Sequence, residues 1–419
     1  MRHFDRSAKS RHALAWLVML TFVATPLAAQ SPAPSVARCS ALMDSVQRAG
    51  PPGPPDFHAI TSVVKPCVDR IDVDSVPPGE LVALARLLRS VGDDRHAGPV
   101  IDRRLTDPRL TSAERRQALA VALEIYGNTD TTLVRSRQLV RELDSLESDE
   151  LDQRIIAHET LVRAASAVDK PDIERAEART LLELASRAAG RDSLAHVRTY
   201  AIRLATESLA DLLAVAHHGD AVGALVDSVL QRFTDLPDLP ASLEPTRARY
   251  ALIGHAAPAL RADAWLGTGA PVTSWRGPVR VLEFTAHWCA PCRLSYPGLV
   301  ALARKRAPSD VQIVLATQTY GYFGTDTALA PGEELARDRA MYAHELPIPA
   351  TIAVERCATR DCDAWHGANQ RAYSVKPLPM FYVVDRSGIV RDVWFGWTEA
   401  SSARLERDVA TLLASPAAP

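Results

Sequence analysis

The sequence lacks most of the features that mark common functional classes. Its 419 residues carry a formal net charge of only −2, without a basic excess or an acidic tail, so neither nucleic acid nor a highly charged partner is predicted. We find no phosphate-binding loop, no dinucleotide-binding glycine motif and no nucleophilic-serine elbow. After residue 29, no segment is long and apolar enough to span a membrane.

The N-terminus has the pattern of a secretory signal peptide. Four basic residues precede an apolar run over residues 13–24, and small residues then surround a cleavage point after Ala29. We therefore predict a signal peptide over residues 1–29 and an exported, periplasmic or otherwise extracytoplasmic protein. A retained membrane anchor is the alternative, although the apolar run is shorter than the roughly 20 residues of a spanning helix. No cysteine follows the run closely, which disfavours a lipid anchor.

Cysteines are few, and export changes their interpretation. In an oxidising compartment an even number of cysteines favours disulfides. Proximity along the chain favours the pairs Cys39–Cys67, Cys289–Cys292 and Cys357–Cys362. A disulfide between Cys39 and Cys67 would close a long loop and contribute roughly 3 kcal/mol to stability, which indicates a structural role.

Composition and periodicity divide the mature chain into four parts. Residues 30–78 are rich in proline, and residues 79–235 show helical periodicity throughout, in pieces of the length of a helical hairpin. We predict an all-α domain there, a solenoid of tetratricopeptide-like type or an irregular bundle. Prolines then mark a linker over residues 236–249. Residues 250–415 alternate strands and helices and end in a hairpin and a helix, which predicts an α/β domain with a mixed central sheet.

The most informative motif is Cys289-Ala-Pro-Cys292. It lies between a predicted strand over residues 279–284 and a predicted helix over residues 294–305. A cysteine at a helix N-terminus is exposed, and the free N–H groups and the helix dipole favour its thiolate. We therefore expect Cys289 to be a nucleophile and Cys292 to be the resolving thiol of a redox dithiol. A stable structural disulfide is the alternative, but it would close almost no chain.

Other residues complete a predicted site around this dithiol. Glu283 lies within the apolar strand, so burial should raise its pKa and suit it to proton exchange with Cys292. Trp288 is expected to shield the sulfurs and, with Leu378, to bind substrate. Pro379 opens a later strand, and in a cis conformation it would present the Leu378 backbone to a substrate, but the sequence alone does not establish that conformation.

Residues 253–413 resemble the thioredoxin superfamily, and within it the exported TlpA/ResA-like thiol–disulfide oxidoreductases. The resemblance rests on ordered motifs around residues 254–258, 275–277, 284–297 and 373–390. It implies that Cys289 attacks, Cys292 resolves and Pro379 is the cis-proline. Many ResA-like members carry a glutamate where this chain has Ser295. The resemblance further implies no cofactor and no resident metal, disulfide-bearing protein substrates such as apocytochrome c, and a membrane redox protein as the electron donor.

The pair Cys357 and Cys362 leaves three interpretations open. A local structural disulfide is one, and a second redox pair that relays electrons from the first dithiol is another. A metal site with His366 is the third, although only three ligands are evident where zinc usually has four.

Three functional hypotheses follow from the sequence. The leading one is an exported enzyme that reduces protein disulfides through Cys289 and Cys292. The second is a helical partner-binding scaffold with an attached redox module. A thiol peroxidase ranks lower, because Thr285 is four residues before Cys289 instead of the three that such enzymes have.

Overall fold

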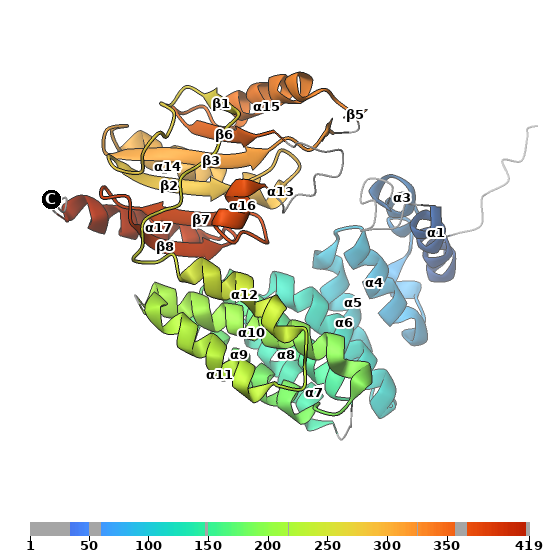
Figure 1. Cartoon of the computed structure of the whole chain (residues 1–419). Helices are drawn as coiled ribbons and strands as arrows, with labels where there is room; N and C mark the ends of the chain where they lie inside the picture. Colours follow the sequence, from blue (N-terminus) through green and yellow to red (C-terminus); the bar gives the residue numbers. More distant parts are fainter. Residues whose placement is uncertain are drawn as a thin grey trace, which may run out of the picture. The chain divides into compact units, whose positions relative to one another are not determined.

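The chain folds as two units, Met1–Val76 and Pro77–Pro419, which we describe separately (Figure 1). The computed structural model describes residues 34–49, 60–146, 150–216, 218–324, 326–356 and 367–415. The predicted signal peptide, Cys357, Cys362 and His366 lie outside these residues. None of the helices in the described part of the chain is long and apolar enough to cross a membrane.

The first unit is small and is joined by a disulfide. A bond between Cys39 and Cys67 links α1 to α3, which is the pairing that proximity favoured. Both cysteines are buried, together with Ile60 and Val64 of the short π-helix between them. The unit's elements are α1 (Val36–Ala49), η1 (Ile60–Val64), α3 (Lys65–Val68) and η2 (Val73–Ser75).

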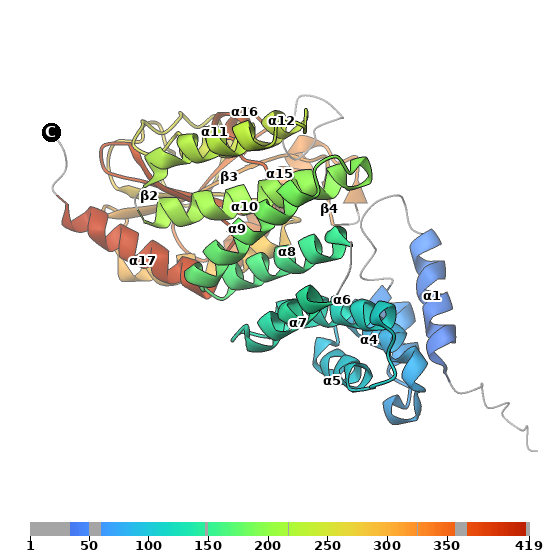
Figure 2. The same cartoon turned by 90° about the horizontal axis from the view of Figure 1, so that it is seen from below.

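The second unit begins with an all-helical region. Each helix packs against the next along the chain, and α4, α6, α8, α10 and α12 also contact one another in succession. This pattern is typical of stacked helical hairpins. Figure 2 shows α8, α9 and α10 side by side. The elements are η3 (Pro78–Glu80), α4 (Leu81–Ser90), α5 (Asp94–Leu105), α6 (Ser112–Thr129), α7 (Val134–Ser145), α8 (Leu151–Ala167), α9 (Pro171–Arg187), η4 (Asp192–Leu194), α10 (Ala195–Val215), η5 (Gly219–Ala221), α11 (Val222–Arg232) and α12 (Leu239–Tyr250).

The segment expected to be a linker is instead largely helical. Within residues 236–249, Leu239 begins α12, and both Leu239 and Leu243 are buried in the core of the helical region. Pro240 lies in the first turn of the helix, where its missing N–H costs no hydrogen bond. Burial of the apolar face therefore outweighs the local effect of the prolines.

The α/β part contains a six-stranded mixed sheet in the order β1-β6-β3-β2-β7-β8. Strands β2, β3 and β6 are parallel, whereas β1, β7 and β8 are each antiparallel to a neighbour. This confirms the predicted α/β class with a mixed sheet. The elements are β1 (Ala264–Gly267), β2 (Val279–Phe284), α13 (Ala290–Arg293), α14 (Tyr296–Lys305), β3 (Val311–Gln318), β4 (Tyr322–Phe323), β5 (Asp326–Thr327), α15 (Pro331–Glu345), β6 (Thr351–Glu355), α16 (Ala368–Ala372), β7 (Met380–Val384), β8 (Val390–Phe395) and α17 (Glu399–Ala414).

Both faces of the sheet are covered, so β2 is buried along its whole length. Val279 and Val281 face apolar residues of α14, α15 and α17. Leu282 and Phe284 face the opposite layer, which includes Tyr373. A polar side chain on β2 is consequently enclosed on whichever face it points to.

Candidate functional site

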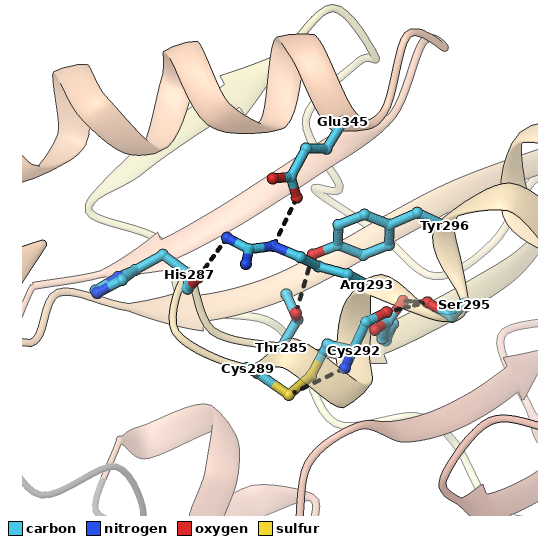
Figure 3. Close-up of a disulfide and its surroundings, with 9 residues drawn as sticks. Thr285, His287, Cys289, Cys292, Arg293, Ser295, Tyr296 and Glu345 are labelled. Carbon is cyan, nitrogen blue, oxygen red and sulfur yellow. Dashed lines mark hydrogen bonds and ion pairs between the residues drawn. A yellow bond between two sulfur atoms is a disulfide. The ribbon is translucent and has the colours of Figure 1, made fainter. Parts of the chain in front are cut away.

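The dithiol lies where the central strand β2 meets the first helical turn after it. Cys289 is the N-cap residue of α13, and its sulfur is bonded to that of Cys292 (Figure 3). The Cys292 backbone N–H also donates a hydrogen bond to Cys289 Sγ, at 3.2 Å. A donor in this position stabilises negative charge on Cys289 when the disulfide is reduced.

The helix that follows differs from the sequence expectation. A helix was expected over residues 294–305, but the structure has a four-residue turn, α13, and a separate helix that starts at Tyr296. Pro297 has no N–H to continue the hydrogen-bond ladder from the preceding turn. The local N–H of Cys292, more than the dipole of a long helix, therefore acts on Cys289.

Cys289 is less accessible than expected, because only 3% of its surface is exposed in the disulfide form. Tyr320 and Leu378 pack against the two cysteines and Ala286. Trp288 is 37% exposed and meets the ring of Tyr320 edge-on, with 5.6 Å between ring centroids. The shielding that we expected from Trp288 is thus provided by Tyr320 and Leu378.

The pairing of β2 with β7 brings Pro379 to the dithiol. Phe284 at the end of β2 lies opposite Met380 at the start of the antiparallel strand β7. Residues before Met380 therefore reach the same edge of the sheet as the residues after Phe284. The Leu378–Pro379 peptide bond is cis.

Glu283 is fully buried on the face of β2 that α14 covers. Burial raises its pKa well above the usual value, because the charged form loses its hydration; a hydrogen bond from Ser295 acts in the opposite direction. Glu283 Oε1 has no hydrogen-bond partner among the described residues. The raised pKa that the sequence led us to expect for Glu283 therefore agrees with its position.

Ser295 connects this acid to the dithiol, a role that the sequence did not reveal. Its hydroxyl lies 2.9 Å from Glu283 Oε2 and donates to the Cys292 carbonyl oxygen at 2.7 Å. A hydroxyl has one hydrogen, so both contacts are satisfied together when the Glu283 carboxyl is protonated and donates to Ser295. The available signal for Ser295 was its departure from the glutamate that many ResA-like members carry at this position.

Arg293 joins the dithiol segment to α15 (Figure 3). Its guanidinium donates to Glu345 Oε2 at 2.9 Å and to the His287 carbonyl oxygen at 3.0 Å. One side chain therefore holds the residues on both sides of the dithiol. It also places a positive charge beside them.

A second polar cluster is formed by His287, in the loop before the dithiol, and by Glu334 and Asp338 of α15. All three side chains are buried, and one ligand atom from each lies within 4.8 Å of the others. Burial lowers the pKa of His287 to about 4 and raises that of Asp338 to about 7. Sequence analysis singled out none of these residues, because Glu334 and Asp338 are distant from His287 along the chain. Cys357, Cys362 and His366 lie outside the described residues, so their three interpretations stay predictions.

Known proteins that are similar to part of this chain include thiol–disulfide interchange proteins. No family model matches the chain. The chain is 30% identical to the thiol:disulfide interchange protein HelX of Rhodobacter capsulatus over 125 residues, which cover 27% of this chain and 67% of that protein. A similar solved structure is a candidate thiol:disulfide interchange protein DsbE from Chlorobium tepidum, with 25% identity, a TM-score of 0.29 and coverage of 38% of this chain and 97% of that one.

A second solved structure, a thiol-disulfide isomerase from Corynebacterium glutamicum, has 22% identity and a TM-score of 0.29, and covers 38% of this chain and 98% of that one. The sheet order, the disulfide at the end of β2 and the HelX match lead to one assignment. Through its C-terminal α/β part, the chain belongs to the thioredoxin-like thiol–disulfide oxidoreductases of the TlpA/DsbE type.

Proposed function

We propose that this oxidoreductase is exported and reduces disulfides in other exported proteins, with Cys289 as the nucleophile and Cys292 as the resolving thiol. The observation that carries the proposal is the Cys289–Cys292 disulfide at the start of α13, beside Leu378 and the cis peptide bond of Pro379. An extended client segment would lie along the Leu378 backbone, and the exposed ring of Trp288 would contact it.

The exchange proceeds in two steps, starting from the reduced dithiol. The Cys289 thiolate attacks one sulfur of a client disulfide, and the other client sulfur leaves as a thiolate and is protonated. Cys292 loses its proton and attacks Cys289 Sγ in the mixed disulfide. The Cys289–Cys292 disulfide forms, and the second client sulfur leaves as a thiol. Two electrons have then passed to the client, and a dithiol of a membrane redox protein restores the reduced state.

Glu283 and Ser295 handle the proton of Cys292 in this scheme. Burial raises the pKa of the Glu283 carboxyl, so its carboxylate is a stronger base towards the Cys292 thiol than that of an exposed glutamate. Ser295 links it to the carbonyl group of Cys292. When Glu283 takes up the proton of Cys292, the hydrogen bond between Glu283 and Ser295 reverses its direction, so that the carboxyl donates to the hydroxyl. This change needs no movement of the backbone.

Trapping of clients tests the proposal. A Cys292→Ser variant retains the nucleophile but lacks the resolving thiol, so mixed disulfides with discrete exported proteins should accumulate and dissolve in reductant. A Cys289→Ser variant is the matched control and should trap none. The reduction potential tests direction: a value near about −270 mV supports a reductase, whereas one near about −120 mV overturns that part of the proposal in favour of an oxidant.

Client identity and location are part of the same proposal. We infer export from residues 1–29, and apocytochrome c is one client class that the family resemblance suggests. Secretion of a fusion that carries these residues, with loss of secretion on their deletion, would test export. Accumulation of oxidised apocytochrome in cells without the protein would test that client.

Partner binding by the helical domain, residues 79–235, is a second candidate function. Val134, Ile156 and Tyr200 are large apolar side chains that this region leaves exposed. A Cys289→Ser/Cys292→Ser double variant separates the two functions, because partners that it retains in reductant are bound without disulfide exchange. The thiol peroxidase hypothesis gains no such support, since the Thr285 side chain is buried and its hydroxyl lies 3.2 Å from the Tyr296 hydroxyl.

A further inference from the structure

The cluster of His287, Glu334 and Asp338 has the geometry of a metal site. His287 lies in the loop between β2 and α13, and the two acids lie one turn apart on α15, so both carboxyl groups point to the same side of that helix. His287 Nδ1 is 3.8 Å from Glu334 Oε1 and 3.6 Å from Asp338 Oδ1. These distances are too long for hydrogen bonds.

The three side chains are almost completely enclosed, and His287 and Asp338 have polar atoms without a hydrogen-bond partner among the described residues. Their exposed fractions are 3% for His287, 0% for Glu334 and 1% for Asp338. Within the described ranges, neither imidazole nitrogen of His287 has a hydrogen-bond partner, and Asp338 Oδ1 has none either. Neither acid forms an ion pair with a lysine or arginine of the described chain. Two enclosed carboxylates without a cation are costly to bury, so a bound cation would stabilise the cluster.

Glu334 is held in place by the backbone. The N–H groups of Tyr320 and Gly321 donate to its two carboxylate oxygens, at 2.6 Å and 2.8 Å. Each oxygen retains a further lone pair, and Oε1 is the atom nearest to His287. Hydrogen bonds of this kind orient a carboxylate as the outer partners of metal ligands do.

Aromatic rings exclude water from the imidazole. The ring of Phe323 stacks on His287 with 5.0 Å between centroids, and the rings of Tyr320 and Tyr322 meet it edge-on. In Figure 3 the His287 ring points away from the two sulfur atoms. The cluster is therefore a separate site from the dithiol, although its histidine is only two residues before Cys289.

We propose that His287, Glu334 and Asp338 bind one divalent transition-metal ion, with Zn²⁺ as the first choice, through three protein ligands that leave the fourth position of the tetrahedron open to an exogenous ligand. Metal–ligand bonds of about 2.1 Å in a tetrahedral site place neighbouring ligand atoms about 3.4 Å apart, close to the distances from His287 Nδ1 to the two acids. One imidazole and two carboxylates suit Zn²⁺ better than the hard ions Mg²⁺ and Ca²⁺, which require more oxygen ligands or retain several waters. The 2+ charge of the ion balances the negative charges of the two carboxylates.

Such an ion would tie the loop before Cys289 to α15 and to the segment that carries Tyr320. Tyr320 packs against the dithiol, and Arg293 joins the dithiol segment to α15, so the ion is a structural support for the active-site loop and takes no part in thiol exchange. Since no cysteine is a ligand, binding persists when Cys289 and Cys292 are oxidised. The site revises the sequence expectation of no resident metal and does not depend on the proposed direction of electron flow.

Metal binding by the oxidised full-length protein tests the proposal. Oxidation removes the dithiol as a competing zinc ligand, and dialysis against a chelator removes ions that were bound during purification. We expect about one Zn²⁺ per chain by elemental analysis after re-addition of Zn²⁺, and a higher melting temperature with Zn²⁺ than without. Asp338→Asn, which keeps the shape of the side chain, and His287→Ala should each weaken binding at least about tenfold.

The matched control is His344→Ala, which removes an exposed histidine of the same helix and should bind Zn²⁺ as the wild type does. Asp338→Asn serves as the principal variant if His287→Ala does not fold. The proposal is overturned if the oxidised wild type binds no stoichiometric Zn²⁺, or if Asp338→Asn and the control bind it equally. Titration with Mn²⁺ and Mg²⁺ tests the choice of ion, and tighter binding of Mg²⁺ contradicts it.

Discussion

Among single residues, Glu283 has the environment with the clearest energetic consequence. It is an acid on a strand that is covered on both faces, and among the described residues only the hydroxyl of Ser295 forms a hydrogen bond with it. A raised pKa means that the folded chain binds a proton which the unfolded chain releases at the same pH. The free energy of unfolding is therefore highest at acidic pH with respect to this group and falls as pH rises.

We predict that Glu283→Gln removes this pH dependence. Below the ordinary glutamate pKa of 4.5 the two proteins should have similar stability. Above it, and up to the raised pKa of the folded state, the wild type should lose up to about 1.4 kcal/mol per pH unit relative to the variant. Urea unfolding at a series of pH values measures this. Glu244→Gln, at an exposed position of α12, should leave the pH slope unchanged, and parallel curves for wild type and Glu283→Gln would contradict the argument.

Ser295 should be coupled to Glu283. We predict that Ser295→Ala lowers the free energy of unfolding by about 1–3 kcal/mol, because the buried Glu283 oxygen loses its partner. In a double-mutant cycle, Glu283→Gln and Ser295→Ala should show an interaction energy of about 0.5–3 kcal/mol. Ser309→Ala, on the surface, should change stability by less than about 0.5 kcal/mol. Strict additivity of the two buried substitutions would show that their contact contributes nothing.

The residues of the site differ in how far the sequence could identify them. Cys289, Cys292 and Glu283 lie within one short segment, so the strand and turn around them indicate their environment. Ser295 was visible only as a departure from a family pattern. The cluster of His287 with Glu334 and Asp338 requires α15 to pack beside the loop, and this depends on tertiary contacts that no local pattern contains.

At the level of elements, local rules failed where packing outweighed them. Prolines predicted a linker over residues 236–249, yet burial of Leu239 and Leu243 stabilises α12 there. After the dithiol, the helix predicted over residues 294–305 corresponds to α14, which starts two residues later because Pro297 separates it from the turn α13. Strand β2 could be predicted, because an enclosed strand is a continuous apolar run.

Helix α14 packs closely against Trp397 in the segment after β8, and substitution of Gly298 in α14 tests how tight this contact is. A Cβ atom added at Gly298 would lie 2.4 Å from Trp397 Cζ2. We predict that Gly298→Ala destabilises the protein by about 1–3 kcal/mol through this overlap, although alanine is the better helix former.

The matched variant is Gly332→Ala in the first turn of α15, where an added Cβ meets no atom within 4 Å. It should be neutral or stabilising by up to about 1 kcal/mol. Melting temperatures of both variants provide the comparison. Equal effects would mean that the ring of Trp397 moves aside at little cost.

Within the second unit, the helical and α/β parts are joined by a buried ion pair network. Arg404 of α17 donates to both carboxylate oxygens of Asp392 on β8, with Nε at 2.7 Å, and its Nη1 donates to Asp211 of α10 at 3.3 Å. Tyr250 of α12 donates to the same Asp211 oxygen. The guanidinium also lies over the ring of Trp394, 5.2 Å from its centroid. One side chain therefore connects elements from both parts.

Removal of the Arg404 guanidinium should cause the helical part and the α/β part to unfold at different urea concentrations. The described tryptophans lie in the α/β part, so their fluorescence reports on that part, whereas circular dichroism at the helical band is dominated by the helices. We predict that Arg404→Leu lowers the free energy of unfolding by about 3–5 kcal/mol, because Asp392 stays buried without its partner. Coincident urea transitions of the wild type should then diverge for the two probes. Arg407→Leu, one turn away and exposed, should keep them coincident; the same behaviour in Arg404→Leu would show that apolar packing alone joins the two parts.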